Sequence, residues 1–137
     1  MEVHSRTSKA AHLLERIGLA LAGASCGLFV AAHIGRSNLE VLASATSVLA
    51  MMCSGAVGFY LGIDIPPHAA FVGRTDPAEL FSAIGTFLAA TAAFVSVYSI
   101  VVDTDPQVVW TVVVWGCWLI GVTFQIAAGA IARLRSL

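Results

Sequence analysis

Charged residues are scarce in this sequence. Only 11% of its 137 residues are Asp, Glu, Lys or Arg, whereas 58% are hydrophobic, and the mean hydropathy is +0.89. A soluble domain carries about a quarter charged residues, so this composition excludes an ordinary soluble protein and places the chain in a lipid bilayer. The net charge of −1 also gives no basis for a nucleic-acid partner.

Reactive motifs are equally few. The three cysteines, Cys26, Cys53 and Cys117, stand singly within apolar runs, without the paired spacing of a redox or metal motif. We interpret them as small buried apolar residues. The sequence contains no nucleophile–base motif and no glycine-rich phosphate loop, so we expect no enzymatic activity and no cofactor. A haem held across the bundle would need two histidines at one depth, which leaves only His12 and His68 as a pair.

The sequence instead contains long runs without charged residues. Roughly 20 helical residues cross a hydrocarbon core of about 30 Å, and every backbone amide within lipid must be paired inside its own segment. We therefore predict an all-α fold, an integral membrane four-helix bundle with short loops that forms a single domain over residues 1–137. The four runs without Asp, Glu, Lys or Arg are 17–35, 41–63, 80–102 and 106–132. The predicted helices are about 13–35, 39–63, 77–102 and 106–132.

The distribution of Lys and Arg predicts the orientation. With four spans, both termini and the loop 64–76 share one side of the membrane, and that side holds every basic residue except Arg36. The opposite side has Arg36 against Glu40, Asp103 and Asp105. Cytoplasmic loops carry the excess of Lys and Arg, so we predict an N-in/C-in topology. The preference for Arg over Lys, with abundant Ala, Val and Gly, suggests a bacterial protein of the inner (cytoplasmic) membrane with several passes.

The start of the chain resembles a secretory signal in outline, because a basic stretch precedes an apolar run and small residues. The apolar run continues unbroken through Ile34, and Gly23 stands where a lipoprotein cleavage site needs an aliphatic residue. We interpret this segment as a first helix that is retained.

Each loop also carries a signal for the start of a helix. A side-chain oxygen at the N-cap accepts from backbone N–H groups that have no partner within the helix, and proline is favoured at the first helical position. A Ser or Thr three residues before Glu forms a capping box. We predict Ser37 with Glu40 for the second helix, Asp76 with Pro77 and Glu79 for the third, and Asp105 with Pro106 for the fourth.

The loop after the second helix is the most polar internal stretch. Its Pro-Pro pair ends the helix near residue 63. The pair holds Asp64 and His68 near the inner mouth of the bundle. His12 and Glu15, at the start of the first helix, lie at the same level. The residue types suit a divalent metal or a proton-sensing group. Because no pair has the spacing of a metal motif, we interpret them as a solvated interfacial belt and predict no metal. This candidate inner-mouth polar cluster is His12, Glu15, Asp64 and His68.

Polar residues deep in the spans are rare. Proton relays and polar transport routes need an ionisable residue deep in the membrane, and Glu15 lies only at the start of its span. The deep candidates are His33, near the outer end of the first helix, and Gln125 in the fourth. We interpret His33 as a snorkelling or hydrogen-bonded interfacial residue, and Gln125 as a residue that bonds across helices. Trp110 fits the outer aromatic belt.

Small residues recur at helical spacing in the spans. Helices associate in lipid through close backbone approach at such residues, and one small-residue stripe is available for an oligomer or a partner. The predicted helix-packing residues are Gly23, Gly27, Gly58 and Gly62. The candidate pore or packing face comprises Ser47, Ser54, Ser82 and Gln125.

Two functional classes remain. We expect a small polytopic membrane protein that acts as a non-catalytic accessory or assembly subunit through helix packing. The alternative is a homo-oligomeric small channel or carrier, for transport through a polar mouth at the cytoplasmic loop 64–76. The expected partners are the lipid bilayer and either a homo-oligomer or a larger membrane complex, without nucleic acid.

Overall fold

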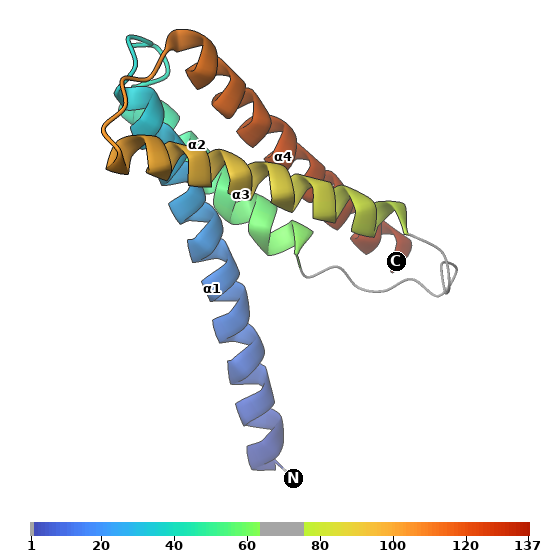
Figure 1. Cartoon of the computed structure of the whole chain (residues 1–137). Helices are drawn as coiled ribbons and strands as arrows, with labels where there is room; N and C mark the ends of the chain where they lie inside the picture. The colour runs from blue at the N-terminus through green and yellow to red at the C-terminus, as the bar shows by residue number, and fades with distance from the viewer. Residues whose placement is uncertain (1, 64–75) are drawn as a thin grey trace.

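The described part of the chain folds as four helices (Figure 1). The computed structural model describes residues 2–63 and 76–137, with the backbone alone for residues 2–12, 14 and 15. Within those ranges there is no strand, so the all-α prediction is confirmed. The helices are α1 (Glu2–Gly35), α2 (Ala45–Gly62), α3 (Pro77–Val101) and α4 (Val108–Arg135).

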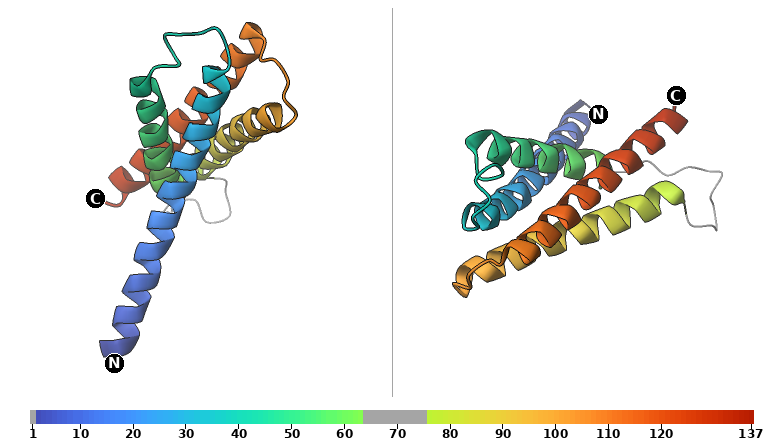
Figure 2. Two further views of the ribbon diagram at one scale, coloured as in Figure 1. Left: turned by 90° about the vertical axis from the view of Figure 1, so that its left-hand side faces the viewer. Right: turned by 90° about the horizontal axis from the view of Figure 1, so that it is seen from above.

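The helices form two antiparallel hairpins. α1 packs along α2 and α3 packs along α4, as the perpendicular views in Figure 2 show. Contacts of α2 with α4 and of α1 with α3 join the hairpins, whereas α2 and α3 touch only slightly. The loops 36–44 and 102–107 lie at one end of the bundle, which we call the two-loop end. The end of α2, the start of α3 and the end of α4 lie at the other, the C-terminal end.

All four helices contain a segment long and apolar enough to cross a membrane: Arg16–Gly35, Ala45–Gly62, Pro77–Val101 and Val108–Arg135. The protein is therefore a multi-pass membrane protein by the length and composition of its helices. Large apolar side chains cover the outside of the bundle, and Phe87 and Phe94 of α3 are each 70% exposed. Such a surface matches lipid chains in polarity.

Two helices begin later than their loop sequences predict. α2 begins at Ala45 rather than near residue 39, and its N-cap is Ser44, whose side chain accepts from the Ser47 backbone N–H. Ser37 instead donates its hydroxyl to the Ile34 carbonyl at 2.6 Å. The predicted capping box of Ser37 with Glu40 is wrong, because Ser37 satisfies the end of α1 and residues 36–43 form turns.

The start of α4 is also corrected. Its N-cap is Gln107, which makes no side-chain cap hydrogen bond, so the predicted cap of Asp105 with Pro106 is wrong. The chain needs residues 102–107 to turn back from α3, which leaves Asp105 and Pro106 in the loop. For α3 the cap prediction is confirmed: Asp76 accepts from the Ala78 N–H at 2.9 Å and Pro77 is the first helical residue.

Glycines set the distance between the helices. A side chain at Gly23 or Gly27 of α1 would overlap the backbone carbonyls of Gly55 and Met51 in α2. In the second hairpin, a Cβ at Gly85 would lie 2.6 Å from the Gly121 carbonyl oxygen, and one at Gly121 would lie 2.8 Å from that of Gly85. The helices in each hairpin therefore approach backbone to backbone.

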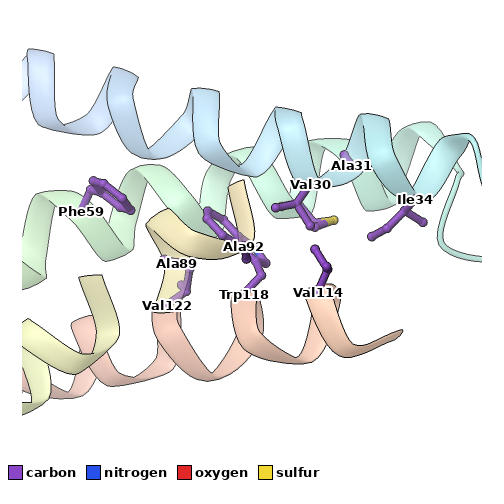
Figure 3. Packing of buried hydrophobic residues seen from close by; sticks show 10 residues of the cluster. Val30, Ala31, Ile34, Phe59, Ala89, Ala92, Val114, Trp118 and Val122 are labelled. Carbon is purple, nitrogen blue, oxygen red and sulfur yellow. The ribbon is translucent and has the colours of Figure 1, made fainter. Parts of the chain in front are cut away.

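A small apolar core lies between the hairpins, around the fully buried Trp118 (Figure 3). The Trp118 ring reaches α2, where a Cβ on Gly55 would lie 2.8 Å from its Cη2 atom. Its neighbours in the cluster come from all four helices, and include Val30, Phe59, Ala92 and Val122. The core thus joins the hairpins at the middle of the bundle. The contacts described next lie on either side of it, toward the two-loop end and toward the C-terminal end.

Candidate functional site

The predicted inner-mouth polar cluster is not resolved into a site. Asp64 and His68 lie outside the described residues, and for His12 and Glu15 only the α1 backbone is described. The cluster therefore stays a prediction. Among the described residues, no group of three or more His, Cys, Asp or Glu side chains could hold a metal ion.

The three serines of the candidate pore or packing face each have a partner. Ser47 shares a 2.9 Å hydrogen bond with Ser44, and Ser54 donates to the carbonyl of Met51 at 3.0 Å in its own helix. Ser82 of α3 donates to the carbonyl of Gly62 and so joins the start of α3 to the end of α2. The first two bonds are local, and the third ties two helices.

Gln125 is the polar centre of the bundle and is fully buried. Its Nε2 donates to Thr86 Oγ1 at 3.0 Å, which is a hydrogen bond from α4 to α3, whereas its Oε1 has no partner among the described residues. Glycines of α2 enclose the side chain: a Cβ on Gly58 would lie 2.9 Å from Oε1, and one on Gly62 would meet its Cβ. Gln125 therefore lies where α2, α3 and α4 meet.

Arginines of α4 close the C-terminal end. Arg133 Nη1 donates to the carbonyl of Leu61 at 2.9 Å, which satisfies an orphan acceptor at the end of α2. Arg135 Nη1 lies 2.7 Å from Oδ1 of the buried Asp76, the N-cap of α3. We call these two contacts the C-terminal latch. It links α4 to both helix ends that flank residues 64–75.

A second tie closes the two-loop end. Arg36 donates to the carbonyl of Ser99 at 3.1 Å and lies 2.7 Å from Asp103 Oδ1. Asp103 has a φ of 54°, the left-handed region that glycine favours. Its N–H bonds to the Ile100 carbonyl, and that of Thr104 bonds to the Ser99 carbonyl. This pattern is a Schellman motif with Asp in the usual glycine position.

A cavity of about 290 Å³ opens beside this tie. Its walls come from α1, α3, α4 and the loop between α3 and α4, and we call it the two-loop cavity. Its polar and aromatic lining residues are His33, Tyr98, Ser99, Thr104, Asp105, Gln107 and Trp110.

His33 forms the α1 wall of the two-loop cavity and is only 3% exposed. Neither ring nitrogen has a hydrogen-bond partner within the described ranges. The expectation of a snorkelling His33 is therefore wrong: the same helix face that buries Val30 and Ile34 also turns His33 inward. The three-residue spacing of His33 from Val30 places both residues near one side of the helix, but that spacing alone does not fix the rotation of α1.

A buried polar group without a partner costs about 1–3 kcal/mol, and such groups in native proteins commonly mark a bound water, an ion or a functional site. His33 combines that property with a cavity large enough for a small molecule. It is the strongest candidate site in the described structure. Comparison with protein-family models, with curated proteins and with solved structures finds no significant match to this chain.

Proposed function

We propose that the protein is a non-catalytic accessory or assembly subunit of a larger membrane complex, and that it docks through α1. The observation that carries this proposal is the length of α1, which has 34 residues, or about 51 Å at 1.5 Å per residue. The uncharged run of α1 covers only residues 17–35, so residues 2–15 extend the helix beyond that run. Figures 1 and 2 show this N-terminal arm standing away from the other helices.

The sequence of α1 supports a docking surface along one side. Apolar or small residues recur with alternating spacings of four and three, which is the repeat of a helix that packs along another helix. In the described part of this stripe, Ile17 is 47% and Leu21 is 63% exposed, so it faces away from the bundle. The α1 stripe comprises Val3, Thr7, Ala10, Leu14, Ile17 and Leu21.

The small-residue contacts of the bundle are already made within the chain. This favours a different protein, and not a second copy of this chain, as the partner. Gly23 and Gly27 are covered by α2, and Gly58 and Gly62 by α4. These four glycines are therefore satisfied within the chain. We infer that the arm engages an amphipathic helix of a larger protein at the membrane surface, which is a common mode of helix recognition.

We propose that the arm lies on the cytoplasmic side of a bacterial inner membrane. Support for this orientation comes from Arg6 and Lys9 in the arm and from Arg133 and Arg135 in the last turn of α4, against Arg36 at the two-loop end.

Extraction in a gentle detergent followed by native mass spectrometry tests the docking proposal. We expect wild-type protein to leave the membrane in a fixed complex with a larger protein. Val3→Asp with Ala10→Asp places two carboxylates on the α1 stripe and should release the subunit. Ser5→Asp with Ser8→Asp adds the same charge on the opposite side of the arm and should leave the complex intact. A wild-type protein that migrates alone, or as a homo-oligomer with nothing else bound, contradicts the proposal.

A homo-oligomeric channel or carrier is the second candidate. The observation that favours it is the Gln125 side chain, whose buried Oε1 lies without a described partner where α2 and α3 touch only slightly. If this polar junction lies on a route that reaches the loop 64–76, Gln125→Leu should abolish ion or solute flux in liposomes. Phe94→Leu, on the exposed face of α3, is the matched control. Equal flux through wild type and Gln125→Leu would contradict this route.

A further inference from the structure

We propose that the two-loop cavity binds an ammonium group carried on a compact apolar body. This ligand site is separate from the α1 stripe, because it lies at the opposite end of α1 and has walls from α3 and α4. A complex formed through the arm would leave it accessible.

The hydrogen-bonding capacity of His33 is unmet within the described structure. His33 is only 3% exposed, and both ring nitrogens lack a partner in the described structure. A neutral imidazole has one nitrogen that accepts a hydrogen bond and one that donates. Both ring nitrogens are buried within the protein, so a ligand N–H group in the cavity reaches the accepting nitrogen once the His33 ring turns toward the cavity.

The charge around the cavity also favours a cation. Among its lining residues there is one carboxylate, Asp105, and no Lys or Arg. The nearest basic side chain in the described loops, Arg36, is committed to Asp103 at 2.7 Å and to the Ser99 carbonyl. Asp105 forms no ion pair within the residues the structure describes. One carboxylate thus remains in excess at the cavity, which favours a cation.

The aromatic lining of the cavity suits an ammonium group. Trp110 of α4 and Tyr98 of α3 both line the cavity, and they are 63% and 59% exposed. The faces of Trp and Tyr rings attract ammonium groups, by about 0.5–1 kcal/mol at exposed sites and more where water is excluded. Val95 and Val114 complete the lining with apolar surface for the body of the ligand.

The same lining disfavours other ligands. An anion would meet Asp105 without a cation to pair with. A metal ion would find too few ligands, because the described part of the chain has no group of three or more suitable side chains. The volume of about 290 Å³ lies at the lower end of the range for small-molecule pockets. A compact ligand fits this volume better than a whole phospholipid.

Three probes that share one apolar cage separate these chemistries: 1-adamantylammonium, 1-adamantanol and 1-adamantanecarboxylate. Calorimetric titration of the full chain in nanodiscs, with empty nanodiscs as the blank, measures binding of each. We expect saturable binding of the ammonium probe, binding of the alcohol that is about tenfold weaker, and none of the carboxylate. Equal binding of the alcohol or the carboxylate would overturn the proposal, and so would the absence of ammonium binding at millimolar concentration.

Two variants assign the binding to this cavity. Asp105→Asn and His33→Phe should each weaken the ammonium probe by about five- to tenfold, the loss expected when one hydrogen bond or charge partner is removed. Glu40→Gln removes an acidic group at the same end outside the lining and should change nothing. Asp105 lies in an exposed loop, so its variant keeps the test valid should His33→Phe misfold. Unchanged binding in Asp105→Asn and in a folded His33→Phe would place the probe elsewhere and overturn the proposal.

Discussion

At the scale of single residues, Asp103 shows how a side chain offsets an unfavourable backbone conformation. A left-handed conformation costs an L-residue roughly 1–2 kcal/mol, and Asp and Asn tolerate it better than most. Glycine would avoid this cost but would leave Arg36 without its carboxylate. The pair is partly open to water, with side-chain exposures of 29% and 91%, so it contributes at most about 1 kcal/mol. The two effects nearly balance.

The balance predicts a ranking of Asp103 variants. Asp103→Gly should change the free energy of unfolding by less than about 1 kcal/mol, because it relieves the backbone and loses the ion pair. Asp103→Ala should cost about 1–2 kcal/mol, because it loses the ion pair and because alanine tolerates the left-handed conformation less well than aspartate does. Asp103→Asn should fall between these two. Unfolding by SDS in mixed micelles measures the series, and equal stabilities of the Asn and Ala variants would refute the role of the left-handed conformation.

At the scale of helices, close packing decides which glycines matter. Gly23 faces α2 so closely that a Cβ there would overlap the Gly55 carbonyl and lie 2.9 Å from Phe59 Cβ. Gly18 lies on the same helix with nothing within 4 Å of its would-be Cβ. Both positions are glycine in a helix, yet only one joins two backbones.

This difference predicts opposite effects of one substitution. Gly23→Ala should destabilise the protein by about 1–3 kcal/mol, because α1 and α2 must separate. Gly18→Ala should be neutral or stabilise by up to about 1 kcal/mol, because alanine favours the helix. The same unfolding measurement compares the two variants. Similar effects at both positions would show that backbone contact at Gly23 contributes little.

At the scale of the whole molecule, most of the fold could be predicted from what a lipid environment requires of a chain. The four spans follow from uncharged runs, because a segment in hydrocarbon must pair its own backbone. The starts of α2 and α4 did not follow. Ser37 stands at a junction where its hydroxyl can end one helix or begin the next, and the structure uses it for the first.

The candidate site was less predictable than the fold. The loop 102–107 takes six residues to reverse direction, so Asp105 and Pro106 stay outside α4. Whether His33 faces lipid, water or a cavity depends on the rotation of α1 about its axis, and α1 is apolar on most sides. A pattern that is hydrophobic nearly all round does not specify which side is buried. The two-loop cavity exists only once three helices and a loop are assembled.

The C-terminal latch also sets an order of events during synthesis. Leu61 is synthesised 72 residues before its partner Arg133, and Asp76 is synthesised 59 residues before its partner Arg135. At 5–20 residues per second, the longer delay is roughly 4–14 s. The end of α2 and the start of α3 are therefore made before the arginines that secure them. The first hairpin must hold its place through its glycine contacts, and α4 completes the bundle last.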